Sequence, residues 1–221
     1  MNYRVFLICV LFLVHLSVQA ETNVLHPTDP KTQRMFEYKI KEAAAAFDKT
    51  DYGTTRKKIE EADGLIPNDP ATINLRGALL YKEKKYDEAL VVFQDLISRD
   101  TNSYPGYFNT AEVLLAQGKY DEALDAFQRI VDARPGDEVS QFRIVIVLSL
   151  QKKFDEARAR ARKIPKMGQS AAYYFAHAAI ELAAGQQEKG LGWIKQSEIL
   201  FPAESSKALR DALVEHQFLK K

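Results

Sequence analysis

The sequence predicts an all-α protein built from a repeated helical hairpin. The motif YDEAL occurs at Tyr86–Leu90 and again at Tyr120–Leu124, 34 residues later. A related motif, FDEAR, follows after a further 34 residues at Phe154–Arg158. Related motifs at a fixed period of this size are typical of repeat arrays, in which each unit packs on its neighbours. The repeat therefore sets the fold class before any single residue is considered.

Each unit is expected to hold two antiparallel helices joined by a tight turn, and the third unit shows this most clearly. Its first helix is predicted over residues 106–117 and its second over 120–133, with the turn at Gly118. The apolar residues of the second helix recur at i, i+4 and i+7, which places them on one face. Pro135 and Gly136 then end the helix.

These features resemble the tetratricopeptide repeat. In that family a small residue on each helix of the pair lies where the two axes come closest, and Ala111 and Ala123 occupy these positions here. The resemblance implies a right-handed superhelix of about five helix-turn-helix units with a C-terminal capping helix. The expected repeats span residues 36–69, 70–103, 104–137, 138–170 and 171–204, and the expected capping helix spans 205–221.

Three of the units depart from the family pattern. The first has Thr55 where a small alanine is expected, and the fifth has Gln187 in place of an aromatic residue. Divergent end units are normal in an array, because they face solvent on one side. In the fourth unit Pro165 arrives early, so that residues 164–170 replace the end of the second helix. This stretch is either a simple shortening or a loop that a partner touches. Beyond the repeats, Ser206 is expected to cap the terminal helix.

Residues 1–20 have the composition of a secretory signal peptide. Arg4 precedes ten apolar residues, Val5–Val14, and the segment ends in the small residue Ala20. The apolar stretch is too short to span a bilayer, which needs about 20 residues. We expect cleavage near Ala20 and a periplasmic or secreted mature protein; the alternative is an uncleaved N-terminal anchor. Residues 21–35 contain two prolines and no apolar period, and are expected to form a linker.

Charge and cysteine content restrict the partner and the compartment. Arg4 is the only charged residue among the first 20, so cleavage leaves 30 cations and 30 anions. Such a chain lacks the basic excess that nucleic-acid binding requires, and no nucleic-acid partner is expected. The single cysteine, Cys9, lies in the signal segment, and the sequence has no N-glycosylation sequon. Both absences favour a bacterial envelope over a eukaryotic secretory route.

No group of residues predicts an enzyme, a cofactor or a metal site. His26, His177 and His216 lie far apart in the sequence, without the spacing of metal ligands. Acidic pairs such as Asp121 and Glu122 open the second helices, where the helix dipole favours negative charge. No glycine-rich phosphate loop occurs. We therefore expect a monomeric, non-enzymatic protein without cofactors.

The resemblance implies a concave groove lined by the first helix of each unit. The family's groove positions are occupied here by a set of residues that is apolar for a protein surface. The ten predicted groove residues are Asn74, Tyr81, Phe108, Asn109, Glu112, Leu115, Phe142, Arg143, Ile146 and Phe175. Two interpretations stay open. The side chains are either buried by tight packing within the array, or they form an apolar groove for a partner helix or peptide.

A subset of the family binds a C-terminal carboxylate through Lys, Asn, Asn, Lys and Arg on three successive units. The matching positions here are Asn74, Ala78, Asn109, Val139 and Arg143. Only Asn109 and Arg143 agree with that pattern, and both lysines are missing. A clamp for chaperone tails is therefore not expected.

Residues 152–166, in the second helix of the fourth unit, carry many more cations than acids. Arg158 and Arg162 share one helix face, whereas Arg160 points elsewhere. The run is either a solvated convex face or a peripheral contact for anionic lipid heads or an acidic partner through Arg158, Arg162 and Lys163.

Together these observations predict a non-enzymatic protein–protein interaction scaffold of the bacterial cell envelope. Its expected partner is a protein or peptide bound in the groove. The alternative function is a membrane-surface or enzyme-associated adaptor that acts through residues 152–166.

Overall fold

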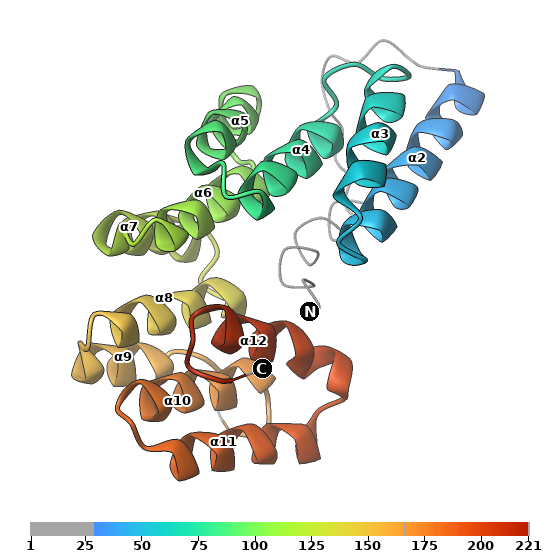
Figure 1. Cartoon of the computed structure of the whole chain (residues 1–221). Helices are drawn as coiled ribbons and strands as arrows, with labels where there is room; N and C mark the ends of the chain where they lie inside the picture. The colour runs from blue at the N-terminus through green and yellow to red at the C-terminus, as the bar shows by residue number, and fades with distance from the viewer. Residues whose placement is uncertain (1–28, 166, 221) are drawn as a thin grey trace. The chain divides into compact units, whose positions relative to one another are not determined.

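The computed structural model describes residues 29–165 and 167–220, and every regular element within them is an α-helix (Figure 1). The helices are α2 (Pro30–Asp48), α3 (Tyr52–Asp63), α4 (Pro70–Lys82), α5 (Tyr86–Arg99), α6 (Tyr104–Ala116), α7 (Tyr120–Ala133), α8 (Glu138–Leu150), α9 (Phe154–Ala161), α10 (Ala171–Ala183), α11 (Gln187–Leu200) and α12 (Ala203–Glu215). The predicted signal peptide, its cleavage near Ala20 and the first part of the predicted linker lie outside the described residues. Over the described ranges, no helix combines the length and the apolar character needed to cross a bilayer.

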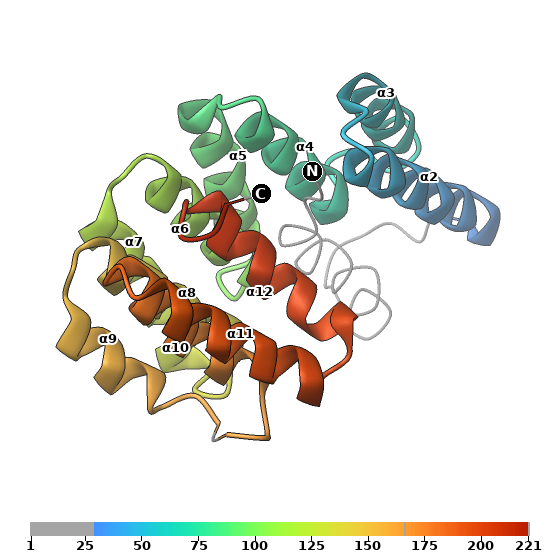
Figure 2. The same ribbon diagram turned by 60° about the horizontal axis from the view of Figure 1, so that its bottom comes forward.

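The chain divides into two compact units, one ending at Thr110 and the other beginning at Ala111. In the first unit α2 packs on α3 and α4 packs on α5, each pair forming a hairpin (Figures 1 and 2). In the second unit α8 pairs with α9 and α10 with α11, while α7 packs on α8 and α12 packs on α10. These are the helical hairpins that the 34-residue period predicts.

The turn inside each hairpin keeps one backbone geometry although its sequence varies. One residue per turn has a positive φ: Thr50 (60°), Lys84 (62°), Gly118 (74°), Lys152 (60°) and Gly185 (79°). The next residue donates its N–H to a carbonyl five positions earlier, as from Lys119 to Leu114 at 2.9 Å. This is the Schellman end of a helix, which glycine favours because it lacks a Cβ. Only two of the five turns carry the glycine that marks such a turn in a sequence.

The two helices of a hairpin approach closely at small residues. A Cβ placed on Gly190 of α11 would lie 2.5 Å from Leu182 Cγ and 3.3 Å from the Ala178 carbonyl oxygen, both on α10. A Cβ on Gly77 of α4 would lie 2.5 Å from Phe93 Cε1 on α5. Only the smallest side chains allow helix axes to come this near.

The array begins earlier than the sequence analysis predicted. Helix α2 starts at Pro30, six residues before Phe36, so the second part of the predicted linker is helical. The Asp29 carboxylate accepts hydrogen bonds from the backbone N–H groups of Lys31 (2.9 Å) and Thr32 (3.2 Å). An aspartate N-cap followed by proline at the first helical position is a favourable helix start. The first turn of α2 is polar and lacks an apolar period, so the start of the helix could not be predicted from hydrophobic spacing.

The fourth unit has the short second helix that Pro165 predicted, whereas the last helix differs in detail from the prediction. Helix α9 has eight residues and ends at Ala161, whereas α7 has 14. Helix α12 begins at Ala203, and Ser206 is not its cap. The Ser206 side chain is buried, with its Oγ 3.4 Å from the Oγ of Ser197 on α11. A hydroxyl expected at a helix end therefore takes part in helix–helix packing.

Candidate functional site

The structure places all ten predicted groove residues in the protein interior. Each is at most 5% exposed, and the three phenylalanines Phe108, Phe142 and Phe175 are at most 1% exposed. Residues 140–149 of α8 are buried without interruption. Of the two interpretations left open by the sequence, burial favours packing for the aromatic residues. Their contribution to partner binding stays a prediction.

Two of the polar groove residues form a buried amide pair in the first unit. Asn109 on α6 donates from Nδ2 to Oδ1 of Asn74 on α4, at 2.7 Å. This single bond leaves Asn74 Nδ2 and Asn109 Oδ1 without a hydrogen-bond partner in the part of the chain that the structure describes. If the nitrogen and oxygen positions of both side-chain amides are exchanged, one donor and one acceptor of the pair still lack a partner. A buried amide group that lacks a partner costs about 1–3 kcal/mol, so the pair can bind a polar group that reaches it.

Two charged groove residues pair in the second unit. Arg143 on α8 donates from Nε to Glu112 Oε1 on α6 at 2.5 Å, and both side chains are at most 2% exposed. The Arg143 guanidinium carbon also lies 5.7 Å from the centre of the Phe142 ring. Two charges removed from water need each other as partners. Arg143, which matches the carboxylate-clamp pattern, therefore has Glu112 as its ionic partner.

The basic residues around α9 have different surroundings. Arg158 pairs with Asp155 at 3.3 Å. Arg160 donates to Gln141 Oε1 at 2.9 Å and also to Gln128, so it is held within the second unit. Arg162 and Lys163 are exposed in the turn that follows α9. Membrane contact through Arg158, Arg162 and Lys163 stays a prediction, and Arg160 is directed elsewhere, as the helix period indicated.

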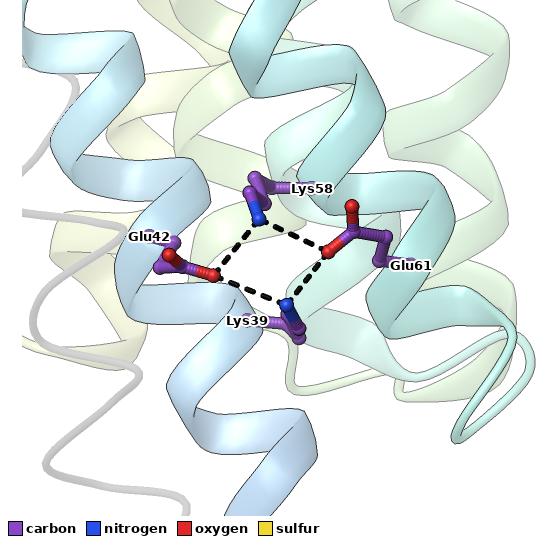
Figure 3. A network of polar contacts seen from close by, with 4 residues as sticks. All are labelled: Lys39, Glu42, Lys58 and Glu61. Atoms are coloured by element: carbon purple, nitrogen blue, oxygen red, sulfur yellow. Dashed lines mark hydrogen bonds and ion pairs between the residues drawn. The ribbon is translucent and has the colours of Figure 1, made fainter.

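A ring of four charged side chains, which was not predicted from the sequence, joins α2 to α3 (Figure 3). The Lys39 ammonium lies 2.8 Å from Glu61 and 3.3 Å from Glu42. The Lys58 ammonium lies 3.1 Å from each of the same two carboxylates. The i, i+3 spacing within each helix is visible in the sequence. The cross-pairing was not predictable, because it depends on how the two helices of the hairpin face each other.

The ring changes the acidity of its members. A hydrogen bond from Lys58 is the main cause that lowers the pKa of Glu42, and a hydrogen bond from Lys39 lowers the pKa of Glu61. The bond to Glu61 in turn raises the pKa of Lys39. Lys39, Glu42 and Glu61 are therefore held in their charged forms.

Aromatic side chains surround His177 in the second unit. Its ring stacks on Trp193 with centroids 4.7 Å apart and lies 4.6 Å from the Tyr173 ring. Burial lowers the pKa of His177; Glu181 opposes this effect and Arg162 adds to it. Among the described residues, no three His, Cys, Asp or Glu side chains gather in a way that could hold a metal ion. His177 is thus a packing residue of the α10–α11 pair.

Comparison with known proteins agrees with this architecture. A family model described as tetratricopeptide repeat matches residues 80–142 and 114–180. No curated protein sequence matches the chain.

Solved structures with a similar fold include a thermophilic tetratricopeptide repeat protein of Thermus thermophilus. It is 17% identical with a TM-score of 0.65, and the match covers 83% of this chain and 100% of that one. A double mutant of MamA is 15% identical with a TM-score of 0.56, covering 78% of this chain and 96% of that one. A further MamA structure is 15% identical with a TM-score of 0.52, covering 76% and 90%.

At these identities the structural similarity shows the fold. The repeated motifs, the helical hairpins with their recurring turn geometry and the family match all point to the same assignment. Residues 80–180 belong to the tetratricopeptide repeat family, and the helical array around them has the same fold.

Proposed function

We propose that this protein is a non-enzymatic scaffold of the bacterial cell envelope that binds an extended peptide segment of a partner protein. Tetratricopeptide repeats generally provide surfaces for protein–protein interaction. The envelope location is supported by the signal-like composition of residues 1–20 and by the absence of cysteine from the rest of the chain.

The observation that carries the proposal is the amide pair of Asn74 and Asn109. An extended peptide presents C=O and N–H groups along its backbone. The unpaired Asn74 Nδ2 can donate to such a carbonyl, and the unpaired Asn109 Oδ1 can accept from such an N–H. Because these amide groups would bind the peptide backbone, they would contribute affinity for peptides of many sequences. Side chains around the pair would then determine which peptide sequences bind best.

The enclosure of the pair has a kinetic consequence. Asn74 and Asn109 are 1% and 0% exposed, so surrounding side chains must move before a peptide reaches them. Association that requires a conformational change is slower than the usual range of about 10⁵–10⁷ M⁻¹s⁻¹. We expect slow binding and slow release.

The test uses peptides selected from a random displayed library against the full chain. Their affinity and association rate are then measured for the wild type and for the Asn74→Leu and Asn109→Leu variants. Leucine keeps the volume and removes the amide, so we expect at least about a tenfold loss of affinity, equivalent to one or two hydrogen bonds.

Asn102→Leu, in the exposed turn before α6, is the matched control and should bind as the wild type does. Thermal melting of each variant separates loss of binding from loss of fold. Equal affinity of all three variants, or failure to select any peptide, would contradict the proposal.

A further inference from the structure

The outer face of α2 differs from the equivalent face of the next repeat. In the first unit α2 packs on α3 and α4, and among the described residues no earlier helix lies beside it. Tyr38 is 56% exposed and Lys41 is also exposed. One repeat later the same positions hold Thr72 and Leu75, which are buried. Within residues 29–165 and 167–220, this face of α2 is therefore uncovered.

This face combines cations with exposed apolar side chains. At 3.6 residues per turn, four cations and Met35 fall within about 60° of Tyr38. The face consists of Lys31, Arg34, Met35, Tyr38, Lys41 and Lys49. Met35 is 44% exposed, and all four cations are exposed and form no ion pair within the described residues.

Asp29 lines the same hollow as Tyr38, and its carboxylate accepts the helix-cap hydrogen bonds from two backbone N–H groups. The acids of α2 itself do not neutralise this face. Glu42 is the one acid of α2 in the same sector, and the ring of Figure 3 holds it against Lys39 and Lys58. The other helical acids, Glu37 and Asp48, lie about 80–100° away from Tyr38 around the helix. The charge ring therefore leaves the four cations of the face free to meet an external anion.

We infer that the outer face of α2 binds an anionic phospholipid surface. Cations flanking exposed apolar side chains are the composition of helices that lie on membranes, and tyrosine prefers the level of the lipid head groups. Each lysine or arginine near an anionic membrane strengthens binding by about fivefold. Four such residues give detectable but reversible binding that weakens with salt.

The position of α2 in the chain supports a lipid over an acidic protein as the partner. Only 15 residues separate Val14, the end of the apolar stretch, from Pro30. Fully extended, they span at most about 54 Å. While that stretch is in a membrane, during export or afterwards, α2 is held close to the lipid surface. An acidic protein would pair with the cations, but contacts with Met35 and Tyr38 would add less to its binding than to that of a lipid surface.

The test measures partition of the full chain onto vesicles of phosphatidylcholine alone and of phosphatidylcholine with about one-third phosphatidylglycerol. The readout is the ratio of the two partition coefficients, because insertion of Val5–Val14 is apolar and contributes equally to both. The variant Lys31→Glu/Arg34→Glu/Lys41→Glu should lower this ratio at least tenfold. Its melting temperature should stay unchanged, because the three side chains are exposed and unpaired.

The control variant, Lys119→Glu/Arg129→Glu/Lys195→Glu, makes the same change of charge at exposed cations of the second unit and should keep the wild-type ratio. An equal ratio for the α2 variant and the wild type would overturn the inference, as would a larger loss in the control. Binding of soluble polyglutamate that depends on the α2 cations, without preference for anionic vesicles, would assign the face to an acidic protein instead.

Discussion

Two polar pairs occupy interior positions that family resemblance assigns to a ligand groove. Asn74 and Asn109 share one hydrogen bond of 2.7 Å, and Glu112 and Arg143 share a salt bridge of 2.5 Å. The amide pair is neutral and keeps an unmet donor and acceptor, so it can gain partners. The ion pair is different, because loss of either member leaves a buried charge without its counter-ion.

We therefore expect Glu112→Ala to lower the free energy of unfolding by about 3–5 kcal/mol. The double variant Glu112→Met/Arg143→Leu removes both charges with little change of volume and should recover most of that loss or exceed the wild type. Urea denaturation followed by circular dichroism measures both. If the single variant lost less than about 1 kcal/mol, Glu112 would not be the main counter-ion of Arg143.

His177 should make stability depend on pH in a specific direction. Burial lowers its pKa in the folded protein, whereas the unfolded chain has the ordinary value of about 6.5. Below that value the unfolded chain binds more protons, so the unfolding free energy falls as the pH drops from about 7 toward the lowered pKa. Denaturation at pH 7 and pH 5 should show a smaller difference for His177→Phe than for the wild type. An identical difference would show that His177 titrates normally.

For single residues, the sequence predicted the position of a side chain on its helix better than it predicted which other side chains cover it. The recurrence of Phe108, Phe142 and Phe175 correctly marked equivalent helix positions, but all three are at most 1% exposed. Helical period identifies which side chains share a face. It does not identify what covers that face, because the covering residues come from other helices.

At the scale of elements, the sequence likewise predicted where the turns lie but not the backbone geometry of each turn. The 34-residue period predicted the hairpins α2–α3, α4–α5, α8–α9 and α10–α11, and Gly118 predicted one turn directly. Thr50, Lys84 and Lys152 adopt the same positive φ without any glycine signal. The flanking helices impose this geometry, and the non-glycine residues bear its strain.

Thr50→Gly should therefore stabilise the protein by about 1 kcal/mol, because a β-branched residue is strained in the left-handed region. Gly118→Ala should destabilise it by a similar amount. Gly136→Ala is the matched control, since a Cβ at either glycine would meet nothing within 4 Å and only Gly118 has a positive φ. Thermal melting compares the three. Equal effects of the two alanine variants would remove backbone strain as the cause.

The charge ring acts between elements, joining α2 and α3. Lys58→Gln removes the contacts of Lys58 to both Glu42 and Glu61, so the pKa values of these carboxyl groups should rise toward their ordinary value. Their lowered pKa values stabilise the folded chain above about pH 4.3, the unfolded value, and this stabilisation is lost as the pH falls through the lowered values. The variant should hence begin to unfold at higher pH during acid titration.

Lys57→Gln, at the exposed neighbouring position on α3, is the control and should follow the wild type. Carbon-detected NMR titration of the glutamate side chains reads both pKa values directly. Unchanged values in Lys58→Gln would mean that Lys39 alone holds the two carboxylates.

Helix boundaries were the least predictable part of the elements. The starts of α2 and α10 depend on a few local hydrogen bonds. Asp29 accepts from the Lys31 and Thr32 N–H groups, and Ser170 Oγ accepts from the Ala172 N–H at 3.1 Å. The repeat period gives the approximate position of each helix but does not contain these local hydrogen bonds. The start of α2 at Pro30 is therefore visible only in the structure, whereas the early end of α9 was predicted from Pro165.

At the scale of the whole molecule, stability depends on how the array ends. Repeats are stabilised by their neighbours, so a terminal helix must cover the apolar face of the last pair. Helix α12 packs on α10 and α11 and buries Ala208, Leu209, Ala212 and Leu213. Its Ser206 also meets Ser197 of α11. These contacts make α12 a part of the fold rather than a tail.

Deletion of residues 203–221 should thus uncover α10 and α11. Burial of two leucine side chains alone contributes about 3–6 kcal/mol, so we expect a large fall in melting temperature and a loss of solubility. Removal of Lys220 and Lys221 only is the control, because neither belongs to α12. Scattering and melting curves compare the two truncations. A deletion that stayed monomeric and melted with the control would mean that the buried leucines add nothing to the last repeat, and that α12 is held in place for a partner instead.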